Sequence, residues 1–100
     1  MIFISEEKDL NFQSKITLVY FYASWMPFNK RMLNLLKNIE NKYSDIVFFA
    51  VDVDYFKAFC KRFSVNSIPE IIIFVDGNEK CRINGIVFSS ALKKAINDIL

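Results

Sequence analysis

Two cysteines are the only side chains of this sequence that could act as strong nucleophiles, and they lie far apart, at positions 60 and 81. A thiol reacts best when a neighbouring base takes its proton, and histidine, the usual base, is absent from the chain. Neither Cys60 nor Cys81 has the cysteine neighbours of a zinc or iron–sulfur site. Asp52 and Asp54 stand close together, but two carboxylates without further ligands are a weak metal signal. These residues therefore predict no metal site and no cofactor.

The charge and the hydropathy of the chain exclude several classes of partner. Lys and Arg number 13 and Asp and Glu number 11, and the formal net charge of +2 is too small for a protein that binds nucleic acid through phosphate contacts. The longest apolar runs, 18–23 and 46–51, are much shorter than the ~20 residues of a membrane helix. The first residues do not resemble a signal peptide. We therefore expect a cytoplasmic protein with reduced thiols that binds neither nucleic acid nor a membrane.

The hydrophobic pattern predicts a single α/β domain over residues 1–100. Nearly continuous apolar runs, typical of strands buried on both faces, predict strands at 15–23 and 45–53. An apolar face with helical spacing predicts a helix over 28–43. The same reasoning predicts further strands at 2–4, 71–75 and 79–84 and further helices at 6–12 and 54–63. A last helix is capped by Ser89 or Ser90. The predicted order of elements is therefore βαβαβαββα. The first half alternates and the second half ends in a hairpin, so we expect a mixed central sheet with helices on both faces.

Several motifs in this order resemble the thioredoxin family, and the resemblance covers almost the whole chain. The strand that ends at Trp25 is similar to the family's F-W-A-x-W, and residues 51–54 read V-D-V-D as in the family. Residues 63–69 match its Y/F-x-V-x-S-I-P, and Gly77 and Gly85 fall at its later glycines. The resemblance implies the thioredoxin fold, a cis bond before Pro69, and an inert Cys60 in a helix on the other side of the sheet from Cys81.

The residues of the active loop depart from that family. The resemblance aligns the family's W-C-G-P-C-K with residues 25–30, which read W-M-P-F-N-K, so Met26 and Asn29 replace the two motif cysteines. The family's buried Asp aligns with Tyr20, whose phenol has a reference pKa of about 10 and is a poor base at neutral pH. Disulfide exchange needs an attacking thiolate and a resolving thiol. We therefore predict no catalytic residue and no dithiol–disulfide exchange in this loop.

The same resemblance implies a groove that binds a protein or an extended peptide, lined by Trp25, Met26, Pro27, Phe28, Ile68 and Pro69. An exposed cluster of this kind is typical of an interaction site, and the alternative is that Phe28 and Met26 fill gaps beneath the loop. Glu70 replaces the family's usual Thr, and either tunes the groove or is solvated. The prediction is a redox-inactive binding or adaptor module of unknown oligomeric state. Two alternatives remain: a thiol–disulfide oxidoreductase that works through Cys60 or Cys81, and a structural subunit of a complex.

Overall fold

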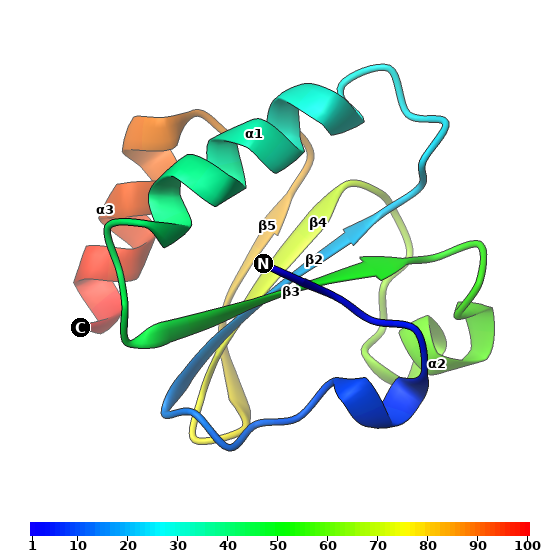
Figure 1. Ribbon diagram of the computed structural model, residues 1–100, viewed down its shortest axis with the longest axis horizontal. Coiled ribbons are helices and arrows are strands. Elements are labelled where there is room, and N and C mark those ends of the chain that lie inside the picture. The colour runs from blue at the N-terminus through cyan, green and yellow to red at the C-terminus, as the bar shows by residue number, and fades with distance from the viewer.

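A computed structural model describes all 100 residues and has a five-stranded sheet with helices on both faces (Figure 1). The elements, in chain order, are β1 (Ile2–Phe3), a 3-10 turn η1 (Glu7–Asp9), β2 (Ile16–Tyr22), α1 (Asn29–Glu40), β3 (Ile46–Asp52), α2 (Lys57–Arg62), β4 (Glu70–Val75), β5 (Asn78–Asn84) and α3 (Ser89–Ile99). This is the thioredoxin fold, and the predicted fold class is confirmed.

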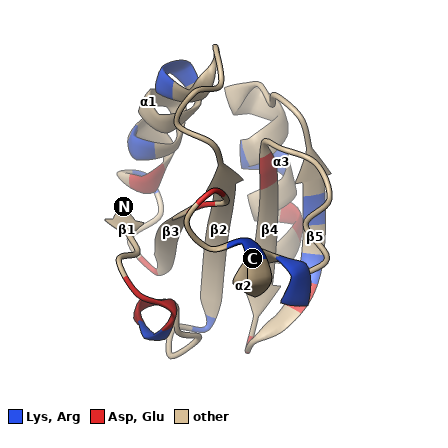
Figure 2. Ribbon diagram, turned by 90° about the vertical axis from the view of Figure 1, so that its right-hand side faces the viewer, with Lys and Arg blue, Asp and Glu red and all other residues tan.

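The strands lie in the order β1-β3-β2-β4-β5. β1, β3 and β2 run parallel, whereas β4 is antiparallel to β2 and β5 is antiparallel to β4. β2 is therefore the central strand, and its first six residues are all buried. Figure 2 shows β2 and β3 almost without charged residues, because helices cover both of their faces.

Two apolar cores lie on the two faces of the sheet. On one face, Leu18 and Tyr20 of β2 pack with Met32 and Leu36 of α1 and with Leu92 of α3. The other core is formed by alternate strand residues and by α2, and includes Val19, Phe21, Ile72, Phe59 and Cys60. Because alternate strand residues point to opposite faces, β2 contributes side chains to both cores.

Some predicted helix boundaries are wrong by several residues. The helix expected over 54–63 begins only at Lys57, because the Asp52 carboxylate accepts the Asp54 N–H at 2.9 Å and holds a turn there. The segment 6–12 contains only the three-residue η1, whose entry is fixed by N–H groups that donate to the Asp9 carboxylate. Neither Ser89 nor Ser90 caps α3, since Phe88 precedes the helix and makes no side-chain cap.

None of the helices has the length and apolar character needed to cross a lipid bilayer.

Candidate binding groove

The loop between β2 and α1 is built from two successive turns. The Met26 N–H donates to the carbonyl of Ala23, and the Asn29 N–H donates to the carbonyl of Met26, both at 3.1 Å. Helix α1 then starts at Asn29, and its first intrahelical bond runs from the Met32 N–H to the Phe28 carbonyl at 3.0 Å. The turns lift Trp25, Pro27 and Phe28 to the surface and leave Met26 half-buried against the α1 core.

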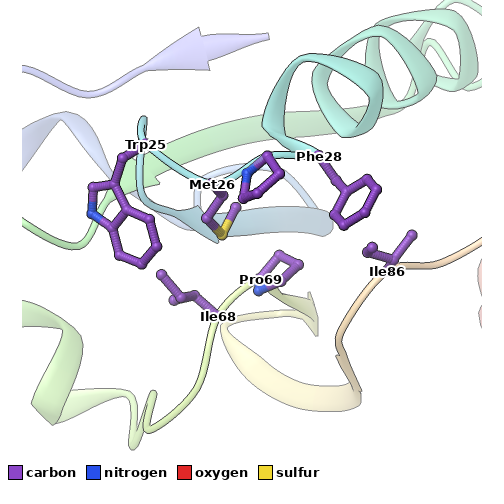
Figure 3. Close-up of a pocket in the computed structure, with 7 residues that line it drawn as sticks. Trp25, Met26, Phe28, Ile68, Pro69 and Ile86 are labelled. Carbon is purple, nitrogen blue, oxygen red and sulfur yellow. The ribbon is translucent and has the colours of Figure 1, made fainter.

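All six predicted groove residues line one pocket, shown in Figure 3. Trp25 and Phe28 are 68% and 47% exposed, so neither ring is part of the core. Ile68 and Pro69 form the opposite wall, and their peptide bond is cis. The cavity measures about 230 Å³, and five of its seven lining residues are hydrophobic. It is smaller than the ~300–1,000 Å³ typical of a small-molecule site, and it suits an apolar side chain better.

Ile86, which the sequence did not predict, also lines the groove. Gly85, which has a φ of +82°, turns the chain out of β5, and its N–H donates to the Pro69 carbonyl at 2.8 Å. That bond holds the segment after β5 against the cis-proline loop, so Ile86 comes to lie beside Phe28 (Figure 3). The sequence offers Gly85 as the sign of a turn here, but it does not single out Ile86, which begins the apolar run of residues 86–88.

The Ile68 backbone beside the groove has no hydrogen-bond partner. Neither its N–H nor its C=O bonds to another backbone group or to a side chain of the chain. Backbone polar groups almost always find a partner in protein or water. A free donor and acceptor on one residue of an extended segment can pair with a second extended chain.

Trp25 is held at its edge of the groove by an acidic turn. The indole N–H donates to Oδ2 of Asp54 at 3.0 Å, and the Asp54 N–H donates to Oδ1 of Asp52. Asp54 therefore orients an indole ring, and the residue that precedes α2 is Phe56, which makes no side-chain cap.

Three side chains stand where the family has its two motif cysteines and its buried acid, namely Met26, Asn29 and Tyr20. None of them exchanges a proton near neutral pH. The Tyr20 hydroxyl donates to Oδ1 of Asn29 at 3.0 Å. Burial, with a smaller contribution from Tyr22, raises the pKa of Tyr20 well above its usual value, so the phenol stays protonated. Met26 carries a thioether, which has no proton to lose.

The two cysteines lie on opposite faces of the sheet, away from the groove. Cys60 is buried in the α2 core, and burial raises its pKa to about 11. Cys81 packs at the edge of the α1–α3 core, and burial and the Asp98 carboxylate raise its pKa as well. Both are free thiols, and a raised pKa makes a thiol a weaker nucleophile at neutral pH.

The position of Glu70 contradicts both interpretations made from the sequence. It is only 3% exposed, so it is not solvated, and it does not line the groove. Its Oε1 accepts a hydrogen bond from Arg82 Nη1 at 3.2 Å, and its Oε2 is buried without a partner. Arg82 also donates to the Phe63 and Ser64 carbonyls, at 2.7 and 3.1 Å. The pair joins β4 and β5 to the loop that leads to Ile68.

No three metal-binding side chains of the structure gather at one place. Asp52 and Asp54 serve the turn and the indole described above.

Comparison with known proteins identifies the class. The sequence model of the thioredoxin family matches residues 5–98. Thioredoxin H5 of Arabidopsis thaliana is 31% identical over 93 residues, which are 93% of this chain and 75% of that protein. A thioredoxin of Chlamydia caviae is 32% identical over 82% of this chain and 80% of its own length. The crystal structure of a thioredoxin from Nicotiana alata is 26% identical, with a TM-score of 0.87 over 97% of this chain and 90% of that one. The chain belongs to the thioredoxin family.

Proposed function

We propose that this protein is a binding or adaptor module that holds an extended protein segment in the groove, without dithiol–disulfide exchange. The observation that carries the proposal is the apolar groove itself, with Trp25 and Phe28 exposed on a loop that contains no cysteine. Exposed aromatic side chains at a concave site are typical of interfaces.

The features of the groove favour a peptide segment as the occupant. The cavity of about 230 Å³ matches one or two apolar side chains. The unpaired N–H and C=O of Ile68 supply the backbone hydrogen bonds that an extended chain requires. We propose that an apolar side chain of the partner enters between Trp25 and Phe28 while the partner backbone pairs with Ile68.

The absence of cysteine at positions 26 and 29 favours binding over catalysis. Disulfide exchange proceeds through a mixed disulfide, which a thioether and an amide cannot form. The two thiols that remain both have raised pKa values and lie outside the groove.

The test is an NMR titration with a capped peptide that has Leu-Val-Leu at its centre and Gly-Ser flanks. The chain has a single tryptophan, so one indole N–H resonance reports directly on the groove. We expect that resonance and the backbone amide of Ile68 to shift in a saturable way. Phe28→Ala should weaken binding at least tenfold, because a fully used aromatic anchor contributes ~2 kcal/mol or more.

Phe3→Ala is the matched control. Phe3 is 44% exposed against 47% for Phe28, and a lysine lies over its ring as Arg31 lies over that of Phe28. Phe3 does not line the groove, so Phe3→Ala should leave peptide binding unchanged. Catalytic turnover in a disulfide-reduction assay that disappears on Cys60→Ser and Cys81→Ser would show instead that the protein is an oxidoreductase.

A further inference from the structure

The groove has an acidic end and a basic end. In Figure 3, Trp25 and Phe28 stand at opposite ends of the lining, with Met26, Ile68 and Pro69 between them. At one end the Trp25 indole is hydrogen-bonded to the Asp54 carboxylate. At the other end the Arg31 guanidinium lies 6.0 Å from the centre of the Phe28 ring.

The carboxylates at the Trp25 end form no ion pair with a basic side chain of the protein. The Asp52 carboxylate accepts a hydrogen bond from the Asp54 backbone N–H, and the Asp54 carboxylate accepts one from the Trp25 indole N–H. Both donors are neutral. Asp54 lines a separate hollow together with Lys57 and Lys61, but neither lysine forms an ion pair with it. The acidic residues that do form ion pairs lie elsewhere and are Glu6, Glu7, Glu40, Glu70, Glu79 and Asp98.

The basic residues at the Phe28 end occupy positions that helix stability disfavours. Lys30 and Arg31 lie in the first turn of α1, which contains no acidic residue. A helix N-terminus carries partial positive charge, so acidic side chains stabilise it and basic ones do not. Both side chains are exposed and form no ion pair. Their positive charge is thus free to interact with a partner.

We infer that the segment bound in the groove carries opposite charges on the two sides of its apolar anchor. A basic residue of the segment lies at the Trp25 end of the groove, and an acidic residue lies at the Phe28 end. This inference rests on the proposed function, because it specifies the occupant of the same groove. Exposed charges contribute modestly to affinity and more to orientation. The two charged ends therefore set the direction in which the segment lies, while the apolar groove holds its anchor.

The test uses two peptides of one composition. Both have Leu-Val-Leu at the centre; one has Lys-Lys before and Glu-Glu after it, and the other has the two charged pairs exchanged. Titrations followed at the Trp25 indole N–H should show that one peptide binds about tenfold more tightly, since two favourable charge contacts replace two unfavourable ones. The preference should disappear at about 1 M salt, where the Debye length is ~3 Å.

Neutralising variants then show which residues set the preference. Asp54→Asn with Asp52→Asn removes both negative charges and keeps an oxygen acceptor for the Trp25 indole and the Asp54 N–H. Lys30→Glu with Arg31→Glu makes both ends acidic, and the fold should tolerate it because acidic residues suit a first helical turn. The aspartate variant keeps one charged end and should reduce the tenfold preference to about threefold, whereas the glutamate variant, with both ends acidic, should abolish it. The control is Lys93→Glu with Lys94→Glu on α3, which changes the net charge as much as Lys30→Glu with Arg31→Glu does. This control variant should keep the preference.

The outcomes separate the inference from the proposed function. Equal binding of the two peptides by the wild-type protein, or a preference unchanged in both groove variants, overturns the charge inference and leaves the binding groove standing. If neither peptide, nor the Gly-Ser-flanked one, shifts the Trp25 indole at millimolar concentration, both proposals are wrong.

Discussion

The hydroxyl of Tyr20 in β2 donates a hydrogen bond to Oδ1 of Asn29, the first residue of α1, at 3.0 Å. In the resemblance drawn from the sequence, these two positions hold the buried acid and the second motif cysteine. Here they are bonded to each other, and the Tyr20 ring also stacks on Tyr22 with ring centres 5.4 Å apart and planes 7° apart. The two substitutions therefore form one packed, hydrogen-bonded unit beneath the loop.

The loop should close a disulfide if both cysteines are introduced as Met26→Cys and Asn29→Cys. The Asn29 N–H donates to the Met26 carbonyl at 3.1 Å, and residues joined by such a turn have Cα atoms within ~7 Å. A disulfide spans that separation. Intact mass after mild oxidation should show the loss of two hydrogens from the monomer, whereas the single variant Met26→Cys should show none. An engineered pair that stays reduced would mean that the turn is not formed as described.

The Asn29→Cys substitution in that variant removes the oxygen that accepts the hydrogen bond of the Tyr20 hydroxyl. Adding Tyr20→Phe to the two-cysteine variant should therefore recover about 1 kcal/mol of the free energy of unfolding, the usual worth of one buried hydrogen bond. In the wild-type background Tyr20→Phe should instead cost about 1 kcal/mol, because there the bond to Asn29 is made. Urea unfolding of the four proteins measures both values.

The sequence predicts what depends on local pattern and ordered motifs. Buried strands such as Ile46–Asp52, the order of elements, and the presence of Trp25, Phe28 and Ile68 in one groove all follow from runs, spacing and resemblance. Ile86 could not be placed in the same way, because its position depends on one backbone bond between Gly85 and Pro69.

Glu70 shows a second limit of sequence reasoning. A carboxylate after a proline, at the start of a strand, is usually solvated, and nothing local indicates burial. Its burial follows from the β4–β5 hairpin, which places Arg82 opposite Ile72 and so brings the guanidinium to the Glu70 side chain. A partner twelve residues away becomes evident only once the strand register is known.

That same pair should respond asymmetrically to mutation. Arg82→Met leaves the Glu70 carboxylate, which is 3% exposed, without its charged partner and leaves the Phe63 and Ser64 carbonyls without donors. We expect a loss of about 3–5 kcal/mol in the free energy of unfolding. Glu70→Gln should cost much less, about 1–2 kcal/mol, because Arg82 keeps its bonds to Glu79 and to both carbonyls.

A double variant makes the comparison specific to the pair. Arg82→Met combined with Glu70→Gln removes the unpaired buried charge, so it should be more stable than Arg82→Met alone. Hydrogen exchange of the amides at 64–68 should rise in both Arg82 variants, since the guanidinium is the donor that fixes this loop. If the double variant is as unstable as the sum of the two single ones, the two side chains do not interact as described.

The buried thiol of Cys60 should make the protein less stable in alkali. Burial raises its pKa from about 9 to about 11, so the folded state keeps a proton that the unfolded chain loses near its ordinary pKa. Below about pH 9 the two states bind the same number of protons, and this contribution to stability is fully present. Between about pH 9 and 11 the unfolded state binds one proton fewer, so the free energy of unfolding falls by about 1.4 kcal/mol per pH unit.

Cys60→Ala isolates that contribution, because it removes the thiol while Tyr20 and Cys81, whose pKa values are also raised, remain. Denaturant unfolding between about pH 8 and 11 should give a steeper decline for the wild-type protein than for Cys60→Ala. The same protonated thiol should react with iodoacetamide at pH 7 far more slowly than a free cysteine, and only when the chain unfolds. Parallel pH profiles together with rapid alkylation in the folded state would show a reactive Cys60, and the oxidoreductase interpretation would then account for the protein better than a binding module does.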